Sequence, residues 1–104
     1  MDNRMCVVLT TMADRDEARR ISKMLLEKNL AACTQEFDVN SRFRWKGVVQ
    51  SEPEIVMLIK TAKGRVDATI EAIKQSHSYE LPEIIVLPVT GGLPGYIDWV
   101  EAET

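Results

Sequence analysis

The order of apolar and polar residues predicts a strand and then a helix at the start of the chain. Residues Met5–Thr11 are almost all apolar or β-branched, which is typical of a strand buried on both faces. Asp14 and Glu17 then have the spacing of a capping box, in which the Asp side chain binds backbone N–H groups of the first turn and the Glu side chain reaches back. The helix that follows is expected to stop at Asn29. Its apolar stripe consists of Ala18, Ile21, Met24, Leu25 and Lys28.

A long hairpin is predicted for the middle of the chain. Residues Leu30–Trp45 suit a long strand with an irregular middle, and Lys46-Gly47 supplies a glycine that can turn the chain with positive φ. We expect the return arm in two pieces, Val48–Val49 and Glu54–Thr61. Pro53 lies between them and has no N–H to donate to a neighbouring strand, so we expect it at a sheet edge or a bulge.

The last third of the chain predicts a helix, a strand and a short helix. Residues Gly64–Ser76 carry apolar side chains at helical spacing, and Glu83–Thr90 is a largely apolar strand. A glycine-rich turn then precedes a short terminal helix, in which Tyr96 and Trp99 are three residues apart.

The elements therefore follow in the order strand, helix, strand, strand, helix, strand, with a C-terminal helix appended. Two right-handed crossover units of this kind give an α+β fold, the ferredoxin-like βαββαβ sandwich, in which both helices cover one face of a four-stranded antiparallel sheet. The other face would be uncovered although its strands are apolar, so we expect another subunit to cover it. The length of 104 residues fits a single domain, 1–104.

Composition and charge argue against several classes of protein. The net charge is -3, and Lys and Arg are scattered among Asp and Glu, so the basic cluster of a nucleic-acid binder is missing. No apolar run approaches the roughly 20 residues of a membrane span, and the run after Arg4 is too short for a signal peptide. Cys6 and Cys33 fall in different predicted strands, which suits reduced thiols better than a disulfide. We expect a cytoplasmic protein without nucleic-acid or membrane partners.

The connection His77–Glu83 is the best candidate for a ligand site. It joins the predicted second helix to the last strand and contains the only histidine, a tyrosine and two carboxylates. Polar groups concentrated in a loop between two rigid elements are typical of a functional site. The chain has no nucleophile–histidine motif and no glycine-rich phosphate loop, so we expect binding and not catalysis.

Five blocks along the chain resemble, in order and spacing, the signature blocks of the CutA divalent-cation tolerance proteins. The blocks are Leu30–Cys33, Ser41–Gly47, Ile59–Thr61, His77–Ile84 and Tyr96–Trp99. One block alone would be weak evidence, but five in the family's order over nearly the whole chain are specific. The resemblance implies a ferredoxin-like subunit with a long bent hairpin, assembled as a homotrimer whose sheet edges pair between subunits. It also implies a trimer similar to the PII signalling proteins, with clefts between the subunits.

The same resemblance implies a metal site that is altered in this chain. Of that site only His77 and Glu83 remain at matching positions, and Glu80 could coordinate Cu(II) or another divalent cation beside them, without an organic cofactor. Thr10 stands where members with a copper site carry a cysteine, and Ser76 where they carry a further histidine, so two ligands are absent. Ser78 replaces the usual proline, which implies a less rigid loop. One imidazole with carboxylates is a small set for Cu(II), so we expect weak binding.

Two functions remain open at this point. The first is a metal-binding homotrimer with Lys60, Tyr79 and Trp45 in the clefts. The second is a PII-like regulatory or scaffolding trimer, in which Lys60 supplies charge and Tyr79 a hydrogen bond to an anionic metabolite while the surface binds a protein partner. A simpler interpretation of His77 is that its imidazole bonds a free carbonyl at the helix end. Trp45 would then serve mainly to pack between subunits.

Overall fold

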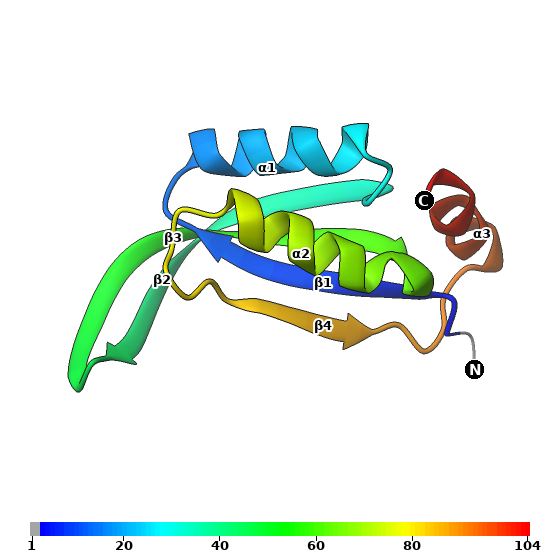
Figure 1. Ribbon diagram of the computed structural model, residues 1–104. Coiled ribbons are helices and arrows are strands. Elements are labelled where there is room, and N and C mark those ends of the chain that lie inside the picture. Colours follow the sequence, from blue (N-terminus) through cyan, green and yellow to red (C-terminus); the bar gives the residue numbers. More distant parts are fainter. Residues whose placement is uncertain (1–2) are drawn as a thin grey trace.

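The computed structural model describes residues 3–104; residues 1 and 2, the start of the predicted domain 1–104, lie outside the described range. The elements are β1 (Met5–Met12), α1 (Arg15–Glu27), β2 (Cys33–Trp45), β3 (Val48–Ala62), the 3-10 turn η1 (Lys63–Arg65), α2 (Val66–Ser76), β4 (Ile84–Pro88) and α3 (Pro94–Glu103). The strands form an antiparallel sheet in the order β2-β3-β1-β4, and α1 and α2 lie together on one face of it (Figure 1). The predicted ferredoxin-like α+β fold, with its C-terminal helix, is confirmed.

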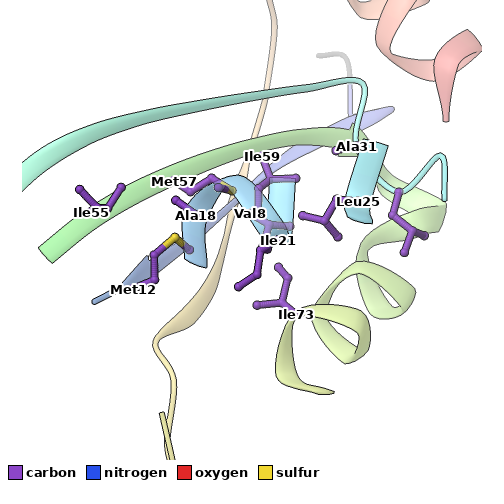
Figure 2. Close-up of a cluster of buried hydrophobic side chains, with 11 residues drawn as sticks. Val8, Met12, Ala18, Ile21, Leu25, Ala31, Ile55, Met57, Ile59 and Ile73 are labelled. Carbon is purple, nitrogen blue, oxygen red and sulfur yellow. The ribbon is translucent and has the colours of Figure 1, made fainter. Parts of the chain in front are cut away.

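The core fills the space between the sheet and the two helices (Figure 2). The fully buried members of the predicted stripe on α1 are Ala18, Ile21 and Leu25. They pack with Val8 of β1 and Ile59 of β3, and each buried aliphatic side chain stabilises the fold by about 1.5–3 kcal/mol. Met24 is half-buried at the margin, whereas Lys28 is exposed, so the prediction was wrong for the last member of the stripe. The helix ends at Glu27, and Asn29, just after the capping residue Lys28, has a positive φ of 56°.

The hairpin of β2 and β3 is more regular than predicted, and its first strand begins at Cys33 and not at Leu30. The two strands pair without interruption from Cys33 opposite Lys60 to Trp45 opposite Val48. The predicted irregular middle and the two-piece return arm are therefore wrong, because the pairing continues across Pro53. β1 pairs with β3 only as far as Ile55, so Pro53 lies where β3 has β2 as its single neighbour in the chain. Its predicted edge position is confirmed.

The outer part of this hairpin extends beyond the rest of the sheet and curves away from it (Figure 1). At its tip Lys46 and Gly47 both have positive φ, 51° and 81°, which is the backbone of a two-residue turn matched to the twist of the strands. The base of the hairpin lies beside the connection between α2 and β4. The fold therefore brings the predicted functional loop against a projecting pair of strands.

Candidate functional site

His77 ends α2, and its side chain is completely buried under the connection that follows. Its Nε2 lies 2.7 Å from the carbonyl oxygen of Thr11 on β1, and the N–H of Tyr79 donates to its Nδ1 over 3.0 Å. Because a carbonyl only accepts, Nε2 carries the ring hydrogen and Nδ1 is the acceptor, which defines the neutral tautomer. The imidazole bonds a carbonyl, as the simpler interpretation of His77 held, but this carbonyl belongs to β1 and not to the end of the helix.

Glu17, in the first turn of α1, holds the same connection from the other side. Its side chain is 7% exposed, and its two carboxylate oxygens accept hydrogen bonds from the N–H of Ser78 at 2.7 Å and the Ser78 hydroxyl at 2.9 Å. Half of the predicted capping box is present, since Asp14 Oδ1 accepts from the Glu17 N–H at 2.8 Å. The other half is wrong, because the Glu17 carboxylate binds the loop and does not reach back to Asp14.

Tyr79 connects the loop to the hairpin through a buried carboxylate. Its hydroxyl donates to Glu54 Oε2 over 2.8 Å, and Glu54 is 8% exposed. Burial, the hydrogen bond to Glu54, and the charges of Glu54, Glu52 and Glu17 raise the pKa of the Tyr79 phenol well above its usual value. The phenol therefore remains a donor, and several carboxylates give this part of the surface a negative potential.

Two clefts open on either side of Tyr79. They share the side chains of Phe43, Trp45, Tyr79 and Leu81. The first, which we call the tip cleft, has a volume of about 490 Å³ and extends to Glu52 and Glu80. The second, the edge cleft, has a volume of about 640 Å³ and extends to Arg42, Glu54 and Glu83. The hairpin aromatics and the loop thus form one wall that divides two adjacent hollows.

The structure brings together most, but not all, of the residues named from the sequence. Trp45 and Tyr79 line both clefts, Glu80 lines the tip cleft and Glu83 the edge cleft, whereas His77 lines neither. Lys60 is also elsewhere: it is paired with Val7, four residues and roughly 13 Å along β1 from Thr11, and its Nζ lies 5.6 Å from the ring centre of Tyr96.

Glu17 and Glu54 were not identified as site residues from the sequence. Glu17 has the spacing of a capping box with Asp14, so the sequence already offered a local partner for its side chain. Glu54 had a usable signal, because it opens an apolar stretch of strand in which a carboxylate needs a specific donor once it is buried. Thr10, at the position of the implied copper-site cysteine, is fully buried on the helix-covered side of β1 and lines neither cleft.

The donor set of one chain fits weak cation binding only. Within residues 3–104, no three or more side chains of His, Cys, Asp or Glu are grouped so that they could hold a metal ion. Both nitrogens of His77 are already engaged in hydrogen bonds, so the imidazole does not fit as a ligand in this conformation. Glu80 and Glu83 are exposed carboxylates, which suit hard, oxygen-preferring divalent cations.

Fold and site define a small α+β protein with acidic, aromatic-walled clefts between a long hairpin and the loop before β4. The family model of the CutA1 divalent ion tolerance protein matches residues 6–103. The divalent-cation tolerance protein CutA of Thermus thermophilus is 37% identical over 99 residues, which cover 94% of this chain and 96% of that protein. The chain belongs to the CutA1 divalent ion tolerance family, as the five sequence blocks predicted.

Solved structures agree with this assignment. The structure of the periplasmic divalent cation tolerance protein CutA from Archaeoglobus fulgidus has a TM-score of 0.93 at 34% identity and covers 95% of this chain and 97% of that one. The chain spans 54% of the length of the chloroplastic protein CutA of Arabidopsis thaliana, to which it is 32% identical over 94% of its own length. No helix in the described part of this chain is long and apolar enough to cross a membrane.

Proposed function

We propose that this chain acts as a homotrimer that binds divalent cations weakly at the clefts beside Tyr79, without catalysis. The observation that carries the proposal is the excess of carboxylates over cations in the clefts. Glu52 and Glu80 line the tip cleft with no basic residue, and Glu54 and Glu83 line the edge cleft with Arg42 alone. An acidic cleft attracts cations and repels anions.

The ligands in this proposal are Glu80 and Glu83, and His77 holds the loop that carries them. Two carboxylates from one chain are few ligands, so water or a neighbouring chain would complete the coordination and the affinity would be low. Cu(II) favours nitrogen and sulfur donors and would have to release His77 from Thr11 and Tyr79. We therefore infer that cations bind here through oxygen donors alone, while His77 keeps its two hydrogen bonds, and Mn(II) is the probe that tests these donors.

Trimer formation is supported by the apolar surface that one chain leaves uncovered. Alternation along the strands places five apolar side chains on the sheet face opposite α1 and α2, and none of them is fully buried: Val7, Leu9, Leu58, Ile85 and Leu87. β4 is also an edge strand with an unpaired backbone on its outer side. An exposed apolar edge of this kind favours association, and pairing in a closed ring would remove it.

Calorimetric titration of the purified protein with Mn(II), Zn(II) and Cu(II) tests the cation proposal. We expect weak binding in the wild type and at least about a tenfold loss of affinity for Mn(II) in the double variant Glu80→Gln and Glu83→Gln, because both charged donors become neutral. Glu27→Gln, an exposed substitution on α1 far from the clefts, is the matched control and should bind as the wild type does.

The alternative outcomes of this experiment are distinct. If the double variant binds Mn(II) as tightly as the wild type, the carboxylate site is wrong. If His77→Gln removes Cu(II) binding while the double variant retains it, the imidazole is the ligand and the loop must open to expose it. Stabilisation by carboxylate or phosphate metabolites in a thermal-shift screen, without an effect of cations, would favour the regulatory alternative instead.

We propose a cytoplasmic location on the basis of the two thiols. Cys6 lies opposite Thr61 and Cys33 opposite Lys60, and neighbouring residues of β3 point to opposite faces of the sheet, so the cysteines cannot pair within a chain. Relatives carry both periplasmic and chloroplastic descriptions. Fractionation of the source cells with an antibody against this chain decides the matter, and recovery in a secreted or periplasmic fraction would overturn the proposal.

A further inference from the structure

We infer that Glu17 is a positioning residue for the clefts, which acts through the backbone of the loop and touches neither cleft itself. Its carboxylate is buried, and both of its oxygens accept hydrogen bonds from one residue, Ser78. The next residue, Tyr79, forms the wall shared by the two clefts. Glu17 is absent from the lining of both, so any influence on binding must pass through the loop.

The bonds form a continuous clamp on three successive loop residues. Glu17 holds Ser78, while the neighbouring His77 is fixed by the Thr11 carbonyl and in turn accepts the N–H of Tyr79. The His77 Nδ1 also lies 3.7 Å from Glu17 Oε2, so the two anchors are adjacent. Ionised acceptors make stronger hydrogen bonds than neutral ones, so the Glu17 carboxylate is the strongest single anchor of this segment.

Serine at position 78 is what makes this clamp possible. Proline has no N–H and no hydroxyl, so it could satisfy neither oxygen of Glu17. A loop stiffened by a proline ring is replaced here by a loop fixed through a buried carboxylate. We expect these bonds to offset the lost ring restraint, because the residue that removes the proline ring supplies two hydrogen bonds in its place.

Amide hydrogen exchange by NMR in the Glu17→Leu variant tests the inference. Leucine keeps most of the volume and removes both acceptors, so we expect the Ser78 amide to exchange about ten- to a hundredfold faster. The decisive amide is that of Tyr79, which bonds His77 and not Glu17. If Glu17 positions the whole segment, Tyr79 exchange rises as well, and the exchange of Val8 in the core reports how far global stability falls.

Three further variants complete the experiment. Glu17→Gln keeps one acceptor for the Ser78 N–H and should restore most of the protection. Ser78→Ala loses only the hydroxyl bond, so the exchange rates should rise less than in Glu17→Leu. Glu27→Leu, on the same helix, should leave the exchange rates of the loop unchanged. Faster exchange confined to Ser78 would make Glu17 a simple cap and overturn the inference. A rise at Val8 without a rise at Tyr79 would show that only global stability is lost and would overturn it too.

A second measurement depends on the proposed function. Residues that orient metal ligands typically contribute 10- to 100-fold to metal affinity, so Glu17→Leu should weaken Mn(II) binding about tenfold although Glu17 lines neither cleft. Unchanged affinity would overturn the positioning role. If the wild type binds no cation at all, the proposed function fails, while the exchange experiment still decides whether Glu17 holds the loop.

Discussion

At the residue scale, the hydrogen bond between Tyr79 and Glu54 links the stability of this protein to pH. Burial and the nearby carboxylates raise the pKa of the Tyr79 phenol in the folded protein, whereas in the unfolded chain it has its usual value near 10. Above about pH 10 the unfolded state therefore loses a proton that the folded state keeps. Fewer protons bound in the unfolded state mean that stability falls as pH rises.

The Tyr79→Phe variant should separate the two contributions of this phenol. At neutral pH it leaves the buried Glu54 without its donor, and we expect the free energy of unfolding in urea to fall by about 1–3 kcal/mol. Between about pH 9 and 11 the variant should lose less stability than the wild type, because the raised pKa is gone. Tyr96→Phe is the control at neutral pH, with an expected change within about 0.5 kcal/mol. Parallel pH profiles for wild type and Tyr79→Phe would contradict the argument.

The site shows which residues could be predicted from the sequence. Trp45, Tyr79, Glu80 and Glu83 were predicted, because a polar loop after a helix and an aromatic hairpin tip are visible in local order. Glu17 could not be assigned to the loop, since its partner Ser78 is 61 positions away and its own backbone offered a nearer alternative. Contacts between distant segments depend on side-chain rotamers that no local pattern determines.

At the scale of single elements, the cap of α1 fixes the first helical turn, which carries Glu17. Asp14 has an extended backbone and accepts the Glu17 N–H, which satisfies one of the free donors of the first turn. We expect Asp14→Ala to lower the free energy of unfolding by about 1 kcal/mol, measured in urea at one protein concentration. Asp16→Ala, two residues later and almost fully exposed, should cost less than about 0.5 kcal/mol. Equal losses in both variants would show that the cap contributes nothing specific.

The elements themselves were largely predictable, and the errors share a cause. Apolar spacing found all four strands and three helices of the described chain, because burial on one face repeats at a fixed period. The long hairpin was predicted as interrupted, since Pro53 and the polar residues beside it are unusual in a central strand. These residues are tolerated because the outer hairpin lies beyond β1, where β3 pairs with β2 alone.

At the scale of the whole molecule, the surface left by one chain is suited to association with identical chains. β2 and β4 are the two edges of the sheet, and the face opposite α1 and α2, of which α3 covers only the end at Met5, is apolar along β1, β3 and β4. Figure 1 shows the outer part of the hairpin extending beyond the rest of the sheet and curving away from it. The clefts beside Tyr79 are lined by Phe43 and Trp45 of this outer part, so association and binding would be coupled in the proposed trimer.

Leu87→Lys tests this coupling most directly. Leu87 is 41% exposed on β4, opposite Val7 and on the face opposite α1 and α2, so a buried lysine there would be costly in the assembly but harmless in a single chain. Light scattering should give the wild type a mass near three times 11.8 kDa and the variant a mass near that of one chain. Thermal stability of the wild type should rise with protein concentration, because dissociation and unfolding are linked.

Leu26→Lys is the matched control for this experiment, since Leu26 is 44% exposed on α1, away from that face. It should remain a trimer with the wild-type melting temperature.

If the assembly also creates the binding clefts, Leu87→Lys should lose Mn(II) affinity while its circular dichroism keeps the spectrum of the folded chain. A wild type of single-chain mass at micromolar concentration would remove the trimer from the proposal, and full Mn(II) binding by monomeric Leu87→Lys would show that each chain binds cations alone.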